Sequence, residues 1–485
     1  MNTYIGIDLG TSSLKGLLVR EDGELLKEAS AAYDVRYPQP GWTEQSPEDW
    51  KTALLFVLES LTSGGAGKTV RGISFGGQMH GLVALDKSGR VIRPCILWND
   101  GRTEEETAYL NDVIGKKTLL ECTGNIAFAG FTAPKLLWLR KHEPENFAKI
   151  DKILLPKDYL AYLLSGIFAT DFSDASGTLL LDVKNKRWSR KMLDVCQISE
   201  HCLPEPKESF AAVSTVLPWA QERFGFSPDV KIVIGAGDNA AAAVGTGTVN
   251  NGDCSVSVGT SGTIFICSDR FGTDEKGSLH SFAHANGKWH RMGCILSAAS
   301  CRKWWLEEIL ESDDYASDER KCAAADSGEV LFLPYLSGER CPHNDVNVRG
   351  AFLGLSHTTT RAEMSRAVME GVAFAIRDCL EIAKQGGVCP ESVSLCGGGA
   401  RSATWRKIFA DVLNLPIRIP KTEQGPAYGA AILAMVGCGA YASVEDAAKR
   451  VTGEKQVILP SEDSVSRLEE KYRRFAKFYP AIKGI

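Results

Sequence analysis

Apolar and polar residues alternate near the start of the chain in a way that predicts a β-hairpin. Residues 4–9 and 14–20 each form a run in which apolar positions recur, and a Gly-Thr-Ser turn at 10–12 separates the two runs. Alternation at a period of two is typical of a half-buried strand. The Glu-Asp-Gly sequence at 21–23 predicts a second turn, which leads into a third strand.

The same pattern returns near the middle of the chain. Residues 255–258 and 263–267 predict two more strands, and the turn between them, at 259–262, again contains Gly-Thr-Ser. Each half also has a later apolar strand that ends in consecutive glycines, at 70–75 in the first half and 392–396 in the second. A hairpin and a glycine-ended strand therefore occur twice, which predicts two halves of similar fold.

The remaining segments fit an α/β fold. Helical periodicity extends over residues 47–61, and a strand at 231–237 leads into an Ala-rich helix. Residues 425–443 carry no charge and are rich in Ala and Gly, which indicates a tightly packed helix rather than a membrane span. A chain of 485 residues has room for two or three domains, and the duplication favours two, at 1–245 and 246–485.

Composition narrows the expected partners to small molecules. Hydrophobic residues make up 44% of the chain and charged residues 24%, and the net charge of −5 provides no basic surface for nucleic acid or an anionic membrane. The fourteen cysteines include no C-x-x-C pair, which argues against a zinc or dithiol site and for reduced thiols. Because no basic and apolar leader starts the chain, we expect a cytoplasmic protein with a small polar substrate.

The repeated turn has the chemistry of a phosphate site. Consecutive Gly, Thr and Ser residues expose backbone N–H groups and hydroxyls with little side-chain obstruction, as an anion requires. A plain hairpin turn explains either copy alone, whereas two facing copies could hold one polyphosphate. The copies differ in charge, because Asp8 in the first occupies the place of Ser257 in the second. The first half could then hold a cation, while the second presents neutral donors.

The sequence from Gly235 to Ala240 supports two interpretations. A strand, G-x-G-x-x-A and a helix begin a dinucleotide fingerprint, as in an NAD-dependent oxidoreductase. Against this, Asp238 would place a carboxylate where the pyrophosphate should bind. Asp238 can instead be a helix N-cap, a general base, or both. Since a helix N-terminus favours the carboxylate form, we expect an ionised side chain that can accept a proton from a hydroxyl.

The sequence GGQMHG, which follows the glycine-ended strand of the first half, is a candidate sugar site. Met79 and His80 would project from the end of the strand, where α/β sheets bind ligands. His can hydrogen-bond a sugar hydroxyl and Met can pack on its carbon face, although ordinary packing is the alternative. His280, His284 and His290 lack a matching Cys or carboxylate spacing, so we expect no zinc site there.

These motifs resemble those of one known family. The chain is similar from end to end to the FGGY carbohydrate kinases, and within them most similar to the xylulokinases. The segments that carry the resemblance are GIDLGTSSLKG, GGQMHG, ILWNDGR, GFTAPKLLWLRKH, LLPKDYL, GAGDNAA, SVGTSG, PYLSGER, GAFLGL, EMSRAVME and CGGGARS. Glycerol kinases carry an Arg-Glu pair where this chain has Met79 and His80, which points away from glycerol. Cys341 stands where relatives more often have Thr, and we expect little effect on the chemistry.

The resemblance implies a fold, a reaction and a set of site residues. The fold is α/β, with two ribonuclease H-like, actin-type ATPase domains hinged around a central cleft. The reaction moves the γ-phosphoryl group of ATP to a terminal hydroxyl of D-xylulose, with Asp238 as the base and Mg²⁺ held by Asp8. The residues expected to contact the sugar are Met79, His80, Asp238 and Asn239. The residues expected along the nucleotide and its phosphates are Gly10, Thr11, Ser12, Gly259, Thr260, Ser261, Gly262, Gly397, Gly398 and Gly399.

Three alternatives stay open. A kinase for ribulose, gluconate or another polyol fits the same motifs, and an oxidoreductase would use the glycine fingerprint at 235–240. A non-catalytic sugar sensor is the third, and the presence of both Asp8 and Asp238 argues against it. The sequence does not show how adenine is bound or whether the chain forms a homodimer.

Overall fold

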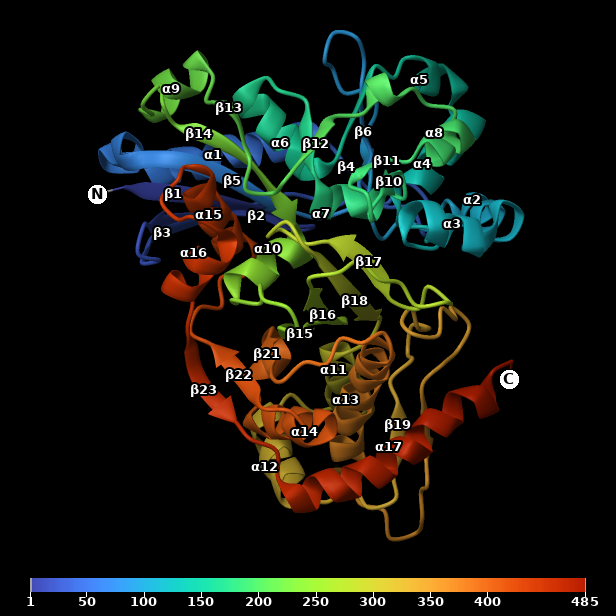
Figure 1. The fold of residues 1–485 in the computed structure, drawn as a ribbon. Coiled ribbons are helices and arrows are strands. Elements are labelled where there is room, and N and C mark those ends of the chain that lie inside the picture. The colour runs from blue at the N-terminus through green and yellow to red at the C-terminus, as the bar shows by residue number, and fades with distance from the viewer. Residues whose placement is uncertain (1, 485) are drawn as a thin grey trace.

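The hairpin expected near the N-terminus lies within a six-stranded sheet (Figure 1). The structure is a computed structural model that describes residues 2–484. The strands of this first sheet are β1 (Thr3–Leu9), β2 (Ser13–Arg20), β3 (Leu25–Ala32), β5 (Val70–Gly77), β13 (Ala212–Thr215) and β14 (Lys231–Gly237). Their order is β13-β14-β5-β1-β2-β3, with β1 antiparallel to β2 and parallel to β5, which in turn is parallel to β14.

A seven-stranded sheet in the second half repeats this order. Its strands are β15 (Cys254–Val258), β16 (Gly262–Ser268), β17 (His280–Ala283), β18 (Trp289–Ile295), β21 (Val393–Cys396), β22 (Ile417–Pro420) and β23 (Glu454–Ile458). The run β18-β16-β15-β21-β22 corresponds to β3-β2-β1-β5-β14 of the first sheet, with the same antiparallel and parallel pairings. Two sheets of one topology confirm the duplicated α/β fold.

Helices cover both sheets. Those of the first half are α1 (Pro47–Thr62), α2 (Glu104–Ala108), α3 (Lys116–Thr123), α4 (Thr132–His142), α5 (Pro144–Ala148), α6 (Pro156–Ser165), α7 (Phe172–Ala175), α8 (Arg190–Cys196), α9 (Pro218–Phe224) and α10 (Asp238–Gly245). Those of the second half are α11 (Ala299–Lys303), α12 (Tyr315–Ala324), α13 (Arg361–Gln385), α14 (Ala403–Leu413), α15 (Gly425–Gly437), α16 (Val444–Val451) and α17 (Glu462–Ile482). Helix α1 confirms the periodicity at 47–61, because Trp50, Leu54, Val57 and Leu61 are buried on one face.

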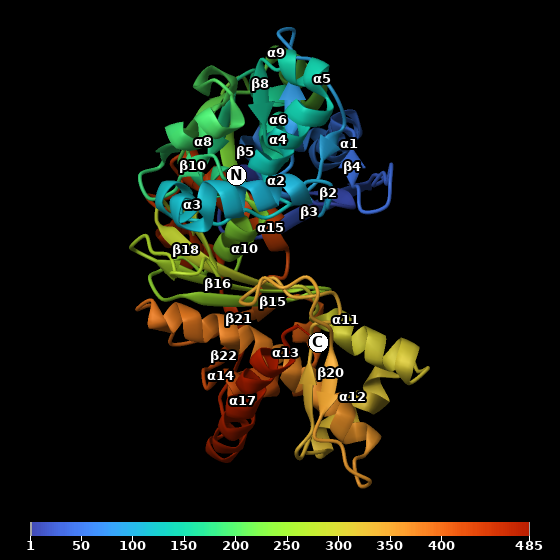
Figure 2. The same ribbon diagram turned by 90° about the vertical axis from the view of Figure 1, so that its right-hand side faces the viewer.

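Helices α10 and α15 lie between the two sheets (Figures 1 and 2). Helix α10 continues from β14 of the first sheet. Helix α15 follows β22 of the second sheet, yet it packs on β1, β5 and β14 of the first. One buried apolar cluster joins both sheets to these helices and includes Leu17 of β2, Phe265 of β16, Val244 of α10 and Ile432 of α15. The two halves therefore share a core where the chain passes between them.

The contact between α10 and α15 is a contact of backbones. A Cβ carbon at Gly429 of α15 would lie 1.7 Å from the carbonyl oxygen of Ala241 in α10. A Cβ carbon at Gly6 of β1 would lie 1.9 Å from the carbonyl oxygen of Ala427 in α15. Only glycine allows backbones to approach so closely, so these two positions fix how near α15 lies to α10 and to the sheet.

The uncharged stretch at 425–443 forms a buried helix, although a shorter one than the sequence suggested. Helix α15 ends at Gly437, and Gly439 adopts a φ of +84°, a left-handed conformation typical of the chain just beyond a helix. No helix within residues 2–484 is long and apolar enough to cross a membrane. All fourteen cysteines are free.

Replacing Gly429 by alanine should destabilise the protein. The methyl group would collide with a backbone oxygen, and overpacking of this kind costs about 1–3 kcal/mol or more, which exceeds the ~1 kcal/mol that alanine gains over glycine in a helix. Urea unfolding should show a lower midpoint. The control is Gly453→Ala, whose added carbon would meet nothing closer than 4.0 Å. Equal stability of the two variants would contradict the packing described.

Candidate active site

Three parallel strands bring the predicted residues to one edge of the first sheet. In the strand register, Asp8 of β1 lies beside Gly76 of β5, and Ala236 of β14 lies beside the same Gly76. The chain therefore leaves all three strands at the same edge, which is where α/β sheets bind ligands. Asp8, residues 78–80 and Asp238 lie together there.

Asp238 is the first residue of α10 and has one carboxylate oxygen fixed and one free. Its Oδ1 accepts hydrogen bonds from the backbone N–H (2.6 Å) and the side-chain Nδ2 (2.8 Å) of Asn239. Its Oδ2 has no donor among residues 2–484. The side-chain amide of Asn239, which we expected on the sugar, thus also holds the expected base.

Asp238 is not the N-cap of its helix, and its pKa is raised by burial. Gly237 is the N-cap of α10, and the Asp238 side chain bonds the following residue instead of capping the helix. Burial raises the pKa of Asp238 to about 6 and outweighs the hydrogen bonds from Asn239, which lower it. The carboxyl group is still mostly ionised at pH 7 and can act as a base.

Asp8 is a carboxylate without a partner. Burial, and then the charge of Asp238, raises its pKa to about 7, while Lys15, its cross-strand neighbour on β2, lowers it in part. Lys15 contacts Glu28 (3.1 Å) and Gln424 (2.5 Å), which leaves Asp8 with no hydrogen bond or ion pair within the described chain. Two neighbouring carboxylates and no bonded cation suit Mg²⁺, which binds one or two carboxylates together with water and phosphate.

Met79 lies against Gly237, the residue before α10, and His80 lies against Gly177. A Cβ carbon at Gly237 would lie 3.0 Å from Sδ of Met79, and one at Gly177 would lie 2.4 Å from Nδ1 of His80. Nδ1–H of His80 donates to the carbonyl oxygen of Gly177 (2.7 Å), and the ring stacks on Phe131 with centroids 4.6 Å apart. Burial lowers the pKa of His80 well below its ordinary value. The ring is therefore neutral, and Nε2 is left as an acceptor.

The backbone of His80 is held in an unusual conformation. Its φ is +70°, in the left-handed region, which costs a residue with a side chain about 1–2 kcal/mol. The carbonyl oxygen accepts hydrogen bonds from Oγ1 of Thr132 (3.0 Å) and from Nζ of Lys135 (2.8 Å). Burial lowers the pKa of Lys135 to about 7. Strain held in place by buried partners is typical of functional sites.

Both Gly-Thr-Ser turns present unpaired amides. The N–H of Gly10 donates to the carbonyl oxygen of Ser13 (3.0 Å), and that of Gly259 donates to the carbonyl oxygen of Ser261 (3.0 Å). The turn amides that have no acceptor anywhere in residues 2–484 are those of Thr11, Ser12, Thr260 and Ser261. Neighbouring free N–H groups at a glycine turn can bind an anion.

Distant residues fix the first turn, and the sequence analysis missed them. Nε2 of Gln45 donates a hydrogen bond to the carbonyl oxygen of Thr11 (2.6 Å). The side-chain Oγ1 of Thr11 accepts a hydrogen bond from Nε1 of Trp98 (3.1 Å) and donates one to Oε1 of Gln78 (3.3 Å). Gln78 and Trp98 belong to segments shared with the kinase family, whereas Gln45 lies outside them. The carbonyl side of the turn is thus occupied, and the amide side is free.

The second turn and the glycines after β21 border a cavity of about 550 Å³. A Cβ carbon at Gly397 would lie 2.8 Å from the carbonyl oxygen of Val258, whereas one at Gly398 would meet nothing within 4 Å. The cavity is lined by residues that include Thr260, Arg302, Tyr315, Gly398, Gly399 and Trp405. Space above glycine, with a guanidinium and aromatic rings nearby, suits a nucleotide.

Arg340 extends from the second half toward Met79 and His80. Its guanidinium lies 5.5 Å from the ring of Phe128, which packs on Phe131, the residue stacked on His80. No ion pair and no hydrogen bond from this guanidinium occurs in the described structure. Arg340 belongs to the segment PYLSGER, but nothing in the sequence indicated that it would face the first half.

The three clustered histidines are core residues. His280, His284 and His290 are buried, and burial lowers the pKa of each. The ring of His280 lies 5.6 Å from that of Phe131, and His290 stacks on Phe265 at 3.9 Å. Among residues 2–484 there is no group of three or more His, Cys, Asp or Glu side chains that could hold a metal ion.

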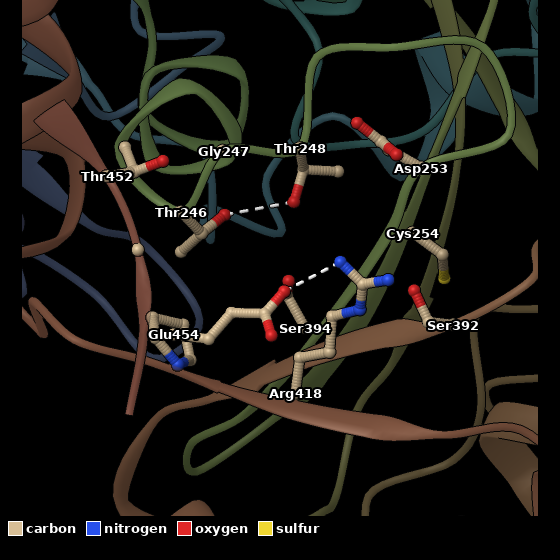
Figure 3. Close-up of a pocket in the computed structure, with 12 residues that line it drawn as sticks. Thr246, Gly247, Thr248, Asp253, Cys254, Ser392, Ser394, Arg418, Thr452 and Glu454 are labelled. Atoms are coloured by element: carbon tan, nitrogen blue, oxygen red, sulfur yellow. Dashed lines mark hydrogen bonds and ion pairs between the residues drawn. The ribbon is translucent and has the colours of Figure 1, made fainter. Parts of the chain in front are cut away.

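A separate polar pocket of about 110 Å³ lies at the end of α10 opposite Asp238 (Figure 3). Thr246 and Thr248, which share a hydrogen bond of 3.0 Å, line it together with the ion pair of Arg418 and Glu454 (2.6 Å). None of the predicted site residues borders this pocket, so it is distinct from the candidate active site.

The arrangement defines a class of protein. The two halves share one strand order, and each has a glycine turn with free amides. The first half also has carboxylates at its sheet edge. These features are typical of a phosphotransferase with the actin-like ATPase fold. The chain belongs to the FGGY family of carbohydrate kinases: residues 3–245 match the family's N-terminal domain, and residues 254–438 match its C-terminal domain.

Known relatives match nearly the whole chain. It is 40% identical over 482 residues to the xylulose kinase of Escherichia coli (strain K12), with 99% of each chain covered. The crystal structure of a "xyloylose kinase" from Brucella ovis has a TM-score of 0.94 at 40% identity and 99% coverage of both chains. That of gluconate kinase from Lactobacillus acidophilus has a TM-score of 0.95 at 26% identity, over 100% of this chain and 98% of the other. These findings confirm the resemblance to carbohydrate kinases.

The oxidoreductase alternative finds no support. Gly235 does not lie in a strand-to-helix turn; it lies within β14, at an irregularity in the pairing with β5, and has a φ of +81°. Asp238 occupies the first turn of α10, where a pyrophosphate would have to bind.

Replacing Asp8 by asparagine should stabilise the metal-free protein at alkaline pH. The pKa of Asp8 in the folded protein is about 7, whereas the ordinary value for an aspartate is ~3.9. Between these two pH values the folded state therefore binds more protons than the unfolded state. Its stability therefore falls as pH rises through this window. Asparagine removes this penalty, roughly 1–2 kcal/mol after allowance for partial exposure.

The measurement is the melting temperature in a chelator at pH 8 and at pH 4. The melting temperature of the Asp8→Asn variant should rise by about 2 °C or more at pH 8 and stay unchanged at pH 4. Asp22→Asn is the control, because a hydrogen bond from Arg20 lowers the pKa of that exposed carboxyl group. A gain at both pH values, or the same gain in the control, would contradict the explanation.

Proposed function

We propose that this protein is an ATP-dependent kinase that converts D-xylulose to D-xylulose 5-phosphate. The observation that carries the proposal is the free Oδ2 of Asp238, which follows Gly237, the residue packed against Met79, at the sheet edge that also holds Asp8. Identity of 40% to the xylulose kinase of Escherichia coli supports D-xylulose as the sugar.

Asp238 acts as the general base. Its Oδ2 accepts the proton of the terminal sugar hydroxyl while the hydroxyl oxygen bonds to the γ-phosphorus of ATP. The bond from that phosphorus to the β–γ bridging oxygen breaks, and ADP leaves. A weak base suffices because the transition state of phosphoryl transfer is loose and the proton leaves late. Asn239 holds Oδ1 and thereby directs Oδ2 toward the sugar.

Met79 and His80 recognise the ketose. The neutral ring of His80 donates through Nδ1 to the protein, so Nε2 accepts a hydrogen bond from a sugar hydroxyl. Met79 packs on the carbon skeleton. Asn239 contributes a second amide proton beyond the one that bonds Asp238. A rigid acceptor and an adaptable apolar contact together suit a polyhydroxylated substrate of small size.

The two glycine turns and the cavity beside β21 bind the nucleotide. The proposed phosphate contacts are Gly10, Thr11, Ser12, Gly259, Thr260, Ser261 and Gly262, and the proposed nucleotide contacts are Gly397, Gly398 and Gly399. Asp8 would hold Mg²⁺ directly or through water. When bound, the ion neutralises charge on the phosphates and on the leaving group.

The halves on either side of the site would act as two domains, 1–245 and 246–485. Closure of one on the other would exclude water, which competes with the sugar hydroxyl as a nucleophile. The shared core of α10 and α15 supports a hinge at this junction.

The function is tested by ADP release from ATP and Mg²⁺ with D-xylulose, in parallel with D-ribulose, L-xylulose, glycerol, gluconate and no sugar. D-xylulose should give the highest kcat/KM, by about tenfold or more, because a pocket that pairs specific hydroxyls discriminates against sugars that leave its polar groups unpaired. A higher kcat/KM for another sugar would overturn the choice of D-xylulose. No sugar-dependent ADP release would overturn the kinase itself and favour the sensor.

Turnover should fall in acid as Asp238 becomes protonated. Burial raises the pKa of Asp238 to about 6, so the base is active above that value and is lost as the pH falls through it. The kcat/KM for D-xylulose should drop by about tenfold for each pH unit below 6. Aliquots returned to pH 7.5 and assayed again control for unfolding. A profile that stays flat down to pH 4.5 would contradict Asp238 as the base.

A further inference from the structure

A buried ion cluster lies beside the end of β14 and has no role in the steps described above. Nζ of Lys157 is 2.6 Å from Oδ1 of Asp158, 2.9 Å from Oδ1 of Asp171 and 3.8 Å from Oδ2 of Asp174. All four side chains are fully buried. Removing one lysine and three carboxyl groups from water is costly, so a buried cluster of this kind is weak evidence of a contribution to stability.

Ser173 connects this ion cluster to the residue before Asp238. Its hydroxyl donates to Oδ2 of Asp171 (2.5 Å) and accepts a hydrogen bond from the backbone N–H of Gly237 (3.1 Å). A hydroxyl has one proton and two lone pairs, so the two bonds are compatible. The negative charge on Asp171 orients the hydroxyl proton and leaves the lone pairs to Gly237.

The backbone before Asp238 is irregular and needs partners outside the sheet. The pairing of β14 with β5 shifts within residues 233–236, and Gly235 has a φ of +81°. The N–H of Gly235 donates to the carbonyl oxygen of Ser209 (3.0 Å) instead of to a neighbouring strand. Pairing with β5 resumes at Ala236 and Gly237, and the N–H of Gly237 bonds Ser173 outside the sheet just before α10 begins.

We propose that Ser173, held by Asp171 of the ion cluster, is a positioning residue for Asp238. The inference rests on the function proposed above. By fixing the amide of Gly237, Ser173 fixes where α10 starts and hence where Oδ2 of Asp238 lies relative to the sugar hydroxyl. A displacement of about 1 Å can lower a rate by ~100-fold without any loss of substrate contacts. His80 is held through the carbonyl oxygen of Gly177, so this contact of the proposed sugar site does not depend on the bond from Gly237 to Ser173.

Ser209 provides a matched control. Its hydroxyl donates to the same Oδ2 of Asp171 (2.6 Å), and it is as buried as Ser173, but it makes no side-chain bond to Gly237. Ser173→Ala and Ser209→Ala each remove one hydrogen bond to the same carboxylate, and Ser173→Ala also leaves the Gly237 amide without its acceptor, so both should lower the melting temperature and Ser173→Ala should lower it more. Only Ser173→Ala should lower kcat by about tenfold or more, with KM for D-xylulose within about threefold of the original value.

Two kinetic outcomes would overturn the positioning role. One is an equal kcat for Ser173→Ala and Ser209→Ala. The other is a lower kcat/KM for Ser173→Ala that comes entirely from a higher KM, with kcat unchanged. If Ser173→Ala does not fold, hydrogen exchange in the unmodified protein decides the question. The Gly237 amide should exchange slowly, and exchange as fast as in an open loop would overturn the inference.

Asp238→Asn separates this inference from the proposed function. Turnover retained in Asp238→Asn would remove Asp238 as the base, and the positioning role would fall with it. An inactive Asp238→Asn protein, together with equal kcat values for Ser173→Ala and Ser209→Ala, would leave the base in place and overturn only the role of Ser173.

Discussion

The direct backbone contact between α10 and α15 is the constraint on which the rest of the structure depends. With Gly429 against the carbonyl oxygen of Ala241, no side chain separates the two helices. Helix α10 starts at Asp238, so the placement of this helix determines the placement of the carboxylate. Helix α15 follows β22 of the second sheet in sequence and packs on the first sheet, so the two halves share one core beside the site.

The site keeps its carboxylates in surroundings that are unfavourable without ligands. Burial raises the pKa of both Asp8 and Asp238, and the charge of Asp238 adds to the effect on Asp8. A cation bound with a phosphate chain would relieve this repulsion. The two carboxylates therefore lower the stability of the protein without ligands and favour binding of the nucleotide with its cation. The turns on both sides contribute amides without acceptors, which complement the opposite charge.

Much of the fold could be predicted because it depends on local patterns. The two hairpins, the glycine-ended strands and the helix at 47–61 are all set by short-range alternation or periodicity, and the structure has them where the sequence indicated. The family motifs located Asp8, Met79 and Asp238 at strand ends, and the parallel register brings them to one edge. The class of protein followed from these motifs.

Features that depend on distant contacts could not be predicted. The raised pKa of Asp238 could not be predicted because the burial that causes it comes from other segments of the chain. Ser173 lies 64 residues before Gly237, and Gln45 lies 33 residues before Gln78. No local pattern links the members of either pair. The contact of α15 with the first sheet was missed for the same reason.

A crystal structure with D-xylulose and a non-hydrolysable ATP analogue tests the central claim most directly. The account predicts the terminal sugar hydroxyl within about 2.6–3.2 Å of Oδ2 of Asp238, in line with the γ-phosphorus, and Nε2 of His80 on another hydroxyl. A complex in which Oδ2 faces a different hydroxyl, or in which the sugar binds away from Met79 and His80, would contradict it.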